Sequence, residues 1–336
     1  MVNIGIVKMN IAKSLVLLLG GGLLACNSPQ NNSNLKDLNL QFIERITEFP
    51  DSSFFSDVRM MEYENGKIYL LDAKRGDVVA LSKDFKKIEI AAPHSEIDLM
   101  MPGTFKVKND TLYVCDYGSV KTLKIYYDGK RIESISSFDF KEKRMAMDRG
   151  NIYVSMPTDT SCFLSFNKLN PYNYIQGGEV VKEKERKRTS LMNKKHIFSN
   201  KENELFFVSE CYPYIDRYNI TEKKNIERLD LSELPFIEEN INYIKEQPIE
   251  PRVYYVYITD GCMYGDDLFL LCASLGKPYY RNLILKIDVS GEKMQLAGYY
   301  ELPGNVYRSI CISDEYLFAA YHGRDCAIEK YKLNEN

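Results

Sequence analysis

Three arginines stand at nearly the same place in three similar stretches of the sequence. Arg59, Arg144 and Arg308 lie eight, seven and eight residues ahead of strands expected to start at residues 67, 151 and 316. A guanidinium group matches the paired oxygens of a carboxylate, sulfate or phosphate. If the fold brings the three side chains together, they form a ligand-binding site for an anion; the alternative is three unrelated surface arginines.

His322 and Arg324 follow the last expected strand, and we add them to this candidate ligand-binding set. His322 belongs to the residue type that titrates near neutral pH, and its alternative role is that of a solvated loop histidine. The chain has three histidines, and none of the seven cysteines after Cys26 lies in a Cys-x-x-Cys pair. We therefore predict no metal site and no cofactor.

Familiar catalytic motifs do not occur after residue 25. There is no Gly-x-Ser-x-Gly elbow, no glycine-rich phosphate loop and no His-Glu-x-x-His pair. These absences favour a binding protein over an enzyme. A metal-dependent hydrolase could still draw its ligands from several repeats without leaving a local motif, so an enzyme remains the alternative and no catalytic residue is assigned.

The N-terminus has the pattern of an export signal. Lys8 and Lys13 precede the apolar run 15–19, which is too short to cross a bilayer as a permanent helix. The stretch Leu23-Leu24-Ala25-Cys26 resembles a bacterial lipobox, and this resemblance implies removal of residues 1–25 and lipidation of Cys26. The alternative is an ordinary cleaved signal with an incidental cysteine. We expect an outer-membrane lipoprotein, on the periplasmic side or at the cell surface.

Residues 26–40 are predicted to tether the anchor to a folded domain at 41–336, because 27–34 carry no charge and no hydrophobic residue. Removing residues 1–25 takes away two lysines and no acid, so the net charge changes from −3 to −5 over the remaining 311 residues. No basic excess is left to neutralise phosphates. We therefore expect no nucleic-acid partner.

One unit recurs six times along this domain: a short strand, a polar turn and an apolar strand with an aromatic near its start. The aromatics are separated by 40 to 63 residues, the length of a propeller blade and too long for an ankyrin or leucine-rich repeat. The sequence therefore predicts an all-β, six-bladed β-propeller. The aligned aromatics are Tyr69, Tyr113, Tyr153, Phe206, Phe269 and Phe318.

The sixth unit lacks a fourth strand, whereas residues 41–46 form a strand with no unit of its own. Pairing the two would close the ring through an N-terminal strand and remove an exposed edge. The alternative architecture is a β-sandwich or two smaller β domains, although no Pro/Gly/Ser linker divides the chain. Residues 232–244 lie between two of the repeated units and have the apolar spacing typical of a short helix.

Two of the apolar strands read IYLLD (68–72) and LYVCD (112–116). They resemble the strands of six-bladed β-propeller lipoproteins of the Bacteroidetes and, more distantly, of NHL-type propellers. The resemblance implies that Asp72 and Asp116 cap turns, and it loosely implies a binding or scaffold role. Later units depart from it, with Met156, Ser209, Cys272 and Tyr321 in place of the aspartate.

We therefore interpret the chain as a lipid-anchored propeller of the cell envelope that acts as a non-catalytic ligand- or protein-binding scaffold. Its axial mouth would take an anionic small molecule, a glycan or a protein partner. The tyrosine pairs 212/214 and 279/280 are expected to be exposed and would suit a glycan. The alternative is a hydrolase or lyase that acts on a glycan or lactone at the same mouth.

Overall fold

The computed structural model describes residues 35–95, 98–118, 120–136, 141, 143–199, 203–248, 253–276 and 278–334. The predicted signal peptide, Cys26 and the tether up to residue 34 lie outside these ranges, and the assignments made for them stay predictions.

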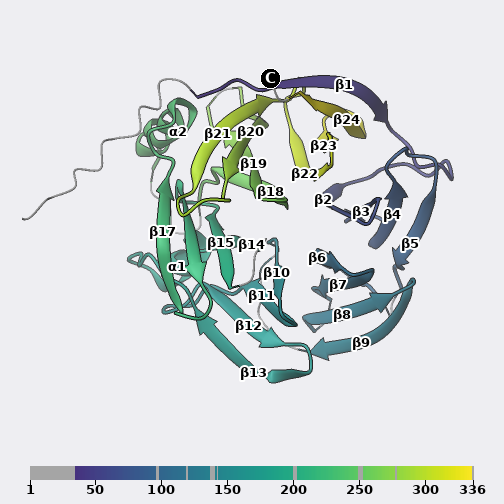
Figure 1. Cartoon of the computed structure of the whole chain (residues 1–336), viewed down its shortest axis with the longest axis horizontal. Helices are drawn as coiled ribbons and strands as arrows, with labels where there is room; N and C mark the ends of the chain where they lie inside the picture. The colour runs from purple at the N-terminus through teal and green to yellow at the C-terminus, as the bar shows by residue number, and fades with distance from the viewer. Residues whose placement is uncertain are drawn as a thin grey trace, which may run out of the picture. The chain divides into compact units, whose positions relative to one another are not determined.

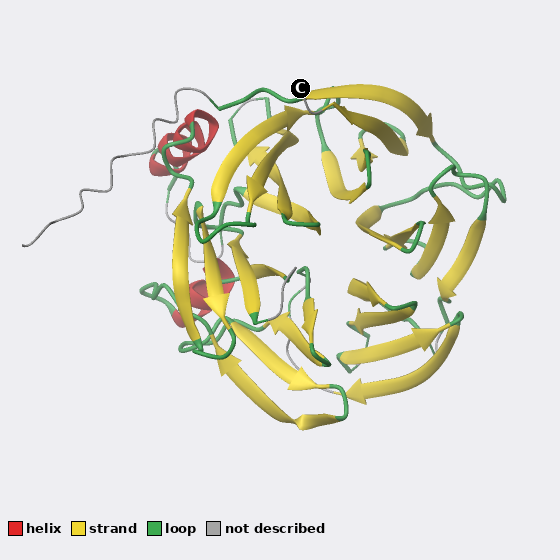
Figure 2. Ribbon diagram, viewed as in Figure 1, coloured by secondary structure: helices red, strands yellow, loops and turns green. Residues whose placement is uncertain are grey.

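Six four-stranded antiparallel sheets surround one axis, one sheet for each predicted repeat (Figure 1, Figure 2). Blades 1 to 3 are β2 (Val58–Glu64), β3 (Lys67–Asp72), β4 (Asp77–Ser82), β5 (Ile88–Ala92); β6 (Pro102–Lys108), β7 (Thr111–Asp116), β8 (Thr122–Tyr127), β9 (Lys130–Ser136); and β10 (Ala146–Asp148), β11 (Asn151–Ser155), β12 (Phe163–Asn167), β13 (Asn170–Gly177). Blades 4 to 6 are β14 (Lys195–Phe198), β15 (Glu204–Ser209), β16 (Tyr214–Asn219), β17 (Lys224–Asp230); β18 (Ile258–Tyr264), β19 (Asp267–Ser274), β20 (Tyr280–Asp288), β21 (Gln295–Glu301); and β22 (Tyr307–Ser313), β23 (Tyr316–His322), β24 (Cys326–Asn334), completed by β1 (Asn39–Ile46). The predicted six-bladed propeller is confirmed, and the β-sandwich alternative is wrong.

The second strand of each blade is buried at nearly every position, because both faces of the blade pack against neighbouring blades. In β3 and β7 the last five residues are all buried. The core is therefore a series of apolar clusters between blades, such as Leu71 and Val78 of blade 1 against Phe105 and Val107 of blade 2. Continuous apolar strands are what a sheet covered on both faces requires.

The ring closes as predicted, through the N-terminal strand. β1 pairs antiparallel with β24, from Asn39 opposite Asn334 to Ile46 opposite Ile328. Figure 1 shows β1 running along the outer edge of the last blade. Both ends of the described chain therefore belong to one sheet, so the last blade depends on the first strand.

Two helices lie outside the blades. α2 (Pro235–Lys245) confirms the helix predicted for 232–244; Pro235 stands in its first turn, where no backbone donor is needed, and Ile237 packs into the core beside blades 4 and 5. α1 (Arg186–Met192) begins in the basic run 182–188. Neither helix of the described chain has the length and apolar character needed to span a bilayer.

Candidate functional site

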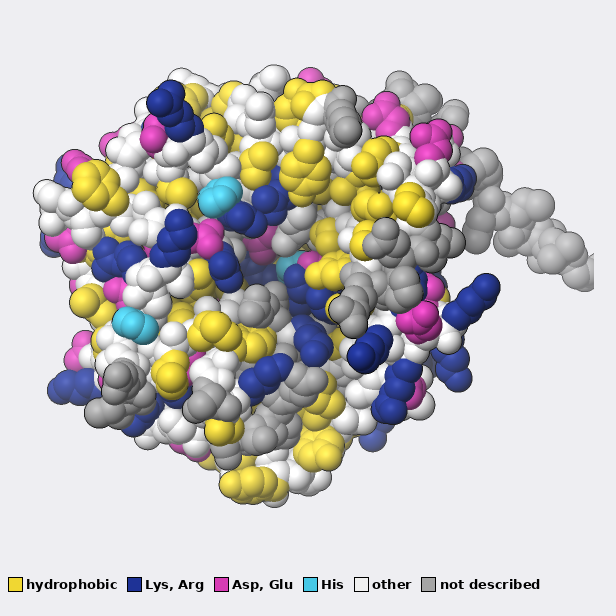
Figure 3. Space-filling view, turned by 180° about the vertical axis from the view of Figure 1, so that it is seen from behind, with side chains coloured by type: hydrophobic (Ala, Val, Ile, Leu, Met, Phe, Trp, Pro, Cys, Tyr) yellow, Lys and Arg dark blue, Asp and Glu magenta, His cyan; other side chains and the backbone are white. Residues whose placement is uncertain are grey.

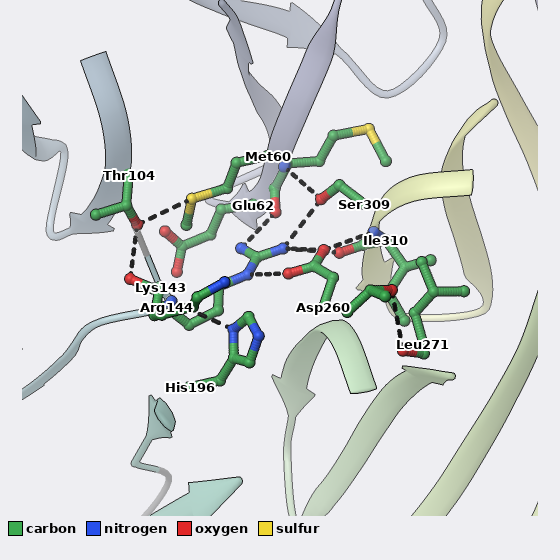
Figure 4. A network of polar contacts seen from close by, with 12 residues as sticks. Met60, Glu62, Thr104, Lys143, Arg144, His196, Asp260, Leu271, Ser309 and Ile310 are labelled. Carbon is green, nitrogen blue, oxygen red and sulfur yellow. Dashed lines mark hydrogen bonds and ion pairs between the residues drawn. The ribbon is translucent and has the colours of Figure 1, made fainter. Parts of the chain in front are cut away.

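One residue from each innermost strand region faces the axis at the same level, and we name these six the axial ring. The aligned aromatic of each blade pairs with a residue of the innermost strand, as Phe318 pairs with Cys311. In five blades the axial residue stands two positions before that partner, as Ser309 stands before Cys311. Extending the register of β10 by two residues puts Arg144 at the same level. The ring consists of Met60, Thr104, Arg144, His196, Asp260 and Ser309, and Figure 4 shows them together.

Arg144 fills the axis with its guanidinium group. Nε and Nη2 donate to the two carboxylate oxygens of Asp260, each at 2.7 Å, and Nη1 donates to the carbonyl of Met61 at 2.7 Å. Nη2 also donates to Ser309 Oγ at 3.1 Å. All three nitrogens are thus engaged by internal partners from blades 1, 5 and 6, so Arg144 connects blades across the axis.

Arg59 and Arg308 point elsewhere, because each is the extra residue of a β-bulge at the start of its strand. The register shifts between Val58 and Met60 in β2 and between Tyr307 and Ser309 in β22. A bulge re-aims the side chain it carries. Each of these two arginines stands one residue before the axial residue of its blade, Met60 or Ser309, which is why they lie eight residues ahead of the next strand and Arg144, itself axial, lies seven.

The two bulged arginines meet at Asp57. Arg59 Nε donates to Asp57 Oδ2 at 2.9 Å, and Arg308 Nε lies 3.9 Å from Asp57 Oδ1. His322 Nε2 contacts Arg308 Nη2 at 3.1 Å, and its Nδ1 lies 4.0 Å from Asp57 Oδ1. The fold therefore brings Arg59, Arg308 and His322 of the candidate set together and directs Arg144 into the axis. Arg324 is exposed at the turn after β23.

Asp57 is held by the aspartate at the end of the IYLLD strand. Asp72 accepts the backbone N–H groups of Ser56 (2.7 Å) and Asp57 (3.1 Å), and those of Lys74 and Arg75. Asp116 makes equivalent contacts with Met100 and Met101. The turn-capping role implied for these aspartates agrees with this geometry, and in blade 1 it positions a site residue.

Arg281 brings a third guanidinium group to this place. The segment 305–306 runs between blades 5 and 6: Arg281 N donates to the carbonyl of Asn305 at 2.7 Å, and His322 N donates to that of Val306 at 2.8 Å. This backbone arrangement sets Arg281 beside Arg308 and His322. Neither Asp57 nor Arg281 was predicted, although Asp57 lies two residues before Arg59 and Arg281 directly follows the 279/280 tyrosine pair.

We name Asp57, Arg59, Arg281, Arg308 and His322 the Asp57 cluster. It holds three guanidinium groups and one carboxylate, and Figure 3 shows Lys, Arg and His side chains around the hollowed centre of one face. Burial lowers the pKa of Arg281, and the neighbouring charge of Arg308 lowers it further against the opposing effect of Tyr279. Burial also lowers the pKa of His322, as does the charge of Arg308, against Asp57. The neutral form of His322 is therefore favoured over the charged form.

Three buried polar atoms of this cluster have no hydrogen-bond partner within the described chain: Asp57 Oδ1, Arg281 Nε and Arg308 Nε. A buried polar group without a partner costs about 1–3 kcal/mol. Such groups require an explanation, and a ligand or ordered water that supplies the partners is the usual one.

The nearest sulfur is not an activated nucleophile. Cys326 Sγ lies 3.7 Å from His322 Nδ1 and donates to the carbonyl of Ser56 at 3.2 Å. Burial raises the pKa of this thiol, and Asp57 raises it further. All seven described cysteines are free thiols, and no group of three or more His, Cys, Asp or Glu among the described residues is arranged for a metal ion.

A cavity of about 350 Å³ lies toward the far ends of the inner strands and has Arg144 among its lining residues. Its charged residues pair with one another or with backbone: Lys106 Nζ donates to Glu62, and Lys108 Nζ donates to the carbonyl of Met147 at 3.1 Å. It therefore lacks the unpartnered guanidinium donors that distinguish the Asp57 cluster.

The expectation that both tyrosine pairs are exposed is wrong for Tyr214. Its side chain is buried between cations, with Lys195 Nζ 4.2 Å and Arg228 Cζ 3.9 Å from the ring centre. Tyr212 donates to Glu183 at 2.8 Å, and Tyr279 stays 45% exposed. The Tyr214 ring of blade 4 is used for internal cation–π contacts. The residues next to it in the sequence do not indicate these contacts.

Solved structures with little sequence identity share this fold. A protein of Bacteroides fragilis NCTC 9343 described as exported is 14% identical, with a TM-score of 0.54 over 91% of this chain and 97% of its own. A virginiamycin B lyase from Staphylococcus aureus is 10% identical, with a TM-score of 0.54 over 88% and 100%. A luciferin-regenerating enzyme is 8% identical, with a TM-score of 0.53 over 89% and 97%.

No protein-family model matches the chain, and no curated protein matches it. Likeness at such low identity shows architecture and carries no activity over, since one fold hosts many functions. The chain is a six-bladed β-propeller closed by its N-terminal strand, similar in structure to an exported Bacteroides protein and to a lyase.

Proposed function

We propose that this protein is a lipid-anchored propeller of the cell envelope that binds a small anionic ligand at the Asp57 cluster and does not transform it. The carrying observation is that Arg281 and Arg308 each keep a buried Nε–H without an acceptor among the described residues, and that they are close enough for the charge of Arg308 to lower the pKa of Arg281. An anion supplies acceptors to both donors and balances an excess of positive charge.

The envelope part of the proposal rests on the N-terminal sequence. Lys8 and Lys13, the apolar run and the Leu-Leu-Ala-Cys stretch form a complete lipoprotein signal, with Cys26 as the lipid-bearing residue. The structural likeness to a protein described as exported accords with this location.

A lyase or hydrolase is the second candidate, and His322 is the observation in its favour. Burial and the charge of Arg308 lower its pKa and so favour the neutral ring, which lies among guanidinium groups where a base could act on a bound anion. Against it, the geometry places His322 Nε2 as the acceptor of Arg308 Nη2, so the lone pair is occupied. Conversion of a bound acid into a new product, lost in His322→Gln, would favour the enzyme.

The binding proposal is tested by calorimetry on residues 27–336 with sulfate, phosphate and a panel of organic acids. A charge-assisted contact contributes about 1.5–3 kcal/mol, so Arg308→Ala should weaken a bound anion about ten- to a hundredfold. The matched control is Arg186→Ala, whose side chain is 84% exposed. If the intact domain binds no anion at millimolar concentration, or if both variants lose binding equally, the proposal is wrong.

A further inference from the structure

The Asp57 cluster contains an unpartnered acceptor beside its unpartnered donors. The Asp57 side chain is 8% exposed. Its Oδ2 accepts from Arg59, whereas Oδ1 has no hydrogen-bond partner among the described residues. A ligand that was only an anion would satisfy the arginines and leave this carboxylate oxygen both unpaired and repelled.

Asp57 Oδ1 has two nitrogen neighbours that lie too far away to donate a hydrogen bond to it. Arg308 Nε lies 3.9 Å away and His322 Nδ1 lies 4.0 Å away, both beyond hydrogen-bond distance. Polar contacts of this length are commonly bridged by an intervening group. The bridging group must donate a hydrogen bond to Asp57.

The local charge decides between the two donor groups that a small ligand can bring, a hydroxyl and an ammonium. Positive groups outnumber the two carboxylates here: Arg308, Arg281 and Lys74 each lower the pKa of His322, while Asp57 and Asp72 raise that of the neighbouring Cys326. An ammonium would add a positive charge to this excess. A hydroxyl donates equally well and carries no charge.

Building on the function proposed above, we propose that the ligand is a hydroxylated carboxylic acid of the sugar-acid class. Its carboxylate accepts from Arg281 Nε and Arg308 Nε, and a hydroxyl group donates to Asp57 Oδ1. The two arginine donors match the two oxygens of one carboxylate. The aspartate accepts a hydrogen bond from the hydroxyl group, which distinguishes a sugar acid from a simple acid.

Calorimetry with three matched probes tests this assignment: D-glucuronate, cyclohexanecarboxylate, which lacks the hydroxyls, and D-glucose, which lacks the charge. Glucuronate should bind about ten- to a hundredfold more tightly than cyclohexanecarboxylate, because one more hydrogen bond reaches a charged acceptor. Glucose should bind more weakly than either acid. In Arg308→Ala both acids should lose affinity.

The isosteric variant Asp57→Asn separates the two proposals. It removes the charge that favours the hydroxyl and repels the carboxylate, so the preference for glucuronate should fall to a few fold, and cyclohexanecarboxylate should bind at least as well as before. The control is Asp77→Asn, another buried aspartate of blade 1 that is paired with an arginine, Arg75. This control should leave the preference unchanged.

Two results overturn the inference while leaving anion binding intact: equal affinity of both acids for the intact protein, or an unchanged preference in Asp57→Asn. Absence of binding by any acid overturns the proposed function as well. Glucose binding as tightly as glucuronate would show that the arginines do not recognise the carboxylate, and would also overturn both.

Discussion

Arg144 and Asp260 form a doubly hydrogen-bonded ion pair at the axis of the propeller, although 116 residues separate them in the sequence. Both side chains are at most 7% exposed. Breaking a buried pair leaves an uncompensated charge and typically costs about 3–5 kcal/mol. Arg144→Met should therefore lower the free energy of unfolding in urea by about that amount, and Arg144→Met with Asp260→Leu should lower it by less.

The control for this prediction is Arg186→Met, because that arginine is 84% exposed and its partner Asp159 is also open to solvent. Its effect should stay within about 0.5 kcal/mol. Equal losses in Arg144→Met and Arg186→Met would show that the axial pair does not hold the blades together.

Deletion of residues 27–48 should lower the melting temperature of the whole domain. β24 would lose the partner to which it is bonded from Asn334 to Ile328, and the last blade would expose an edge. Calorimetry should show one transition at lower temperature. Deleting 27–34 alone is the control and should leave melting unchanged; an unchanged melting temperature for the longer deletion would contradict closure by β1.

His196 should make the domain less stable in mild acid. Burial, and then the charges of Lys143 and Arg144, lower its pKa well below 6.5, while Glu210 Oε1 lies 4.0 Å from its Nε2. The unfolded chain keeps a value near 6.5. Below that pH the unfolded state binds a proton that the folded state does not, so stability is retained above pH 6.5 and falls as pH decreases, by up to about 1.4 kcal/mol per pH unit.

Urea unfolding at pH 7.5, 6.5 and 5.5 measures this effect. The loss between pH 6.5 and 5.5 should be about 1 kcal/mol smaller in His196→Gln than in the unchanged chain. His94→Gln is the control, because His94 is exposed and its Nδ1 contacts the carbonyl of Leu99 in the loop after β5. Parallel pH profiles for all three proteins would rule out His196 as the source.

Cys26→Ser should abolish lipidation and leave the folded domain intact, because only the thiol can receive the diacylglycerol. Incorporation of labelled fatty acid in cells is the measurement, and the melting temperature of the purified domain is the check on folding. Unchanged labelling of the serine variant would remove the anchor from the proposed function.

The repeat itself was readable in the sequence because it is local. In the sequence, a polar turn followed by an apolar strand indicates each hairpin. In the structure, Asn65 and Gly66 adopt the positive φ angles of +49° and +80° that such a turn needs. Residues 41–46 form a strand without a unit of its own, and the sixth unit lacks a fourth strand. Together these two features predicted that the N-terminal strand completes the last blade. Closure follows because an open ring would expose two sheet edges.

The direction of the arginine side chains was decided only by the tertiary structure. The spacings of eight, seven and eight look equivalent along the chain, yet Arg59 and Arg308 are bulge residues one position before the axial level, whereas Arg144 stands at that level. One residue of register turns a side chain from the mouth into the axis. Asp57 and Arg281 join the site across blades 1, 5 and 6, and only ring closure brings these distant segments together.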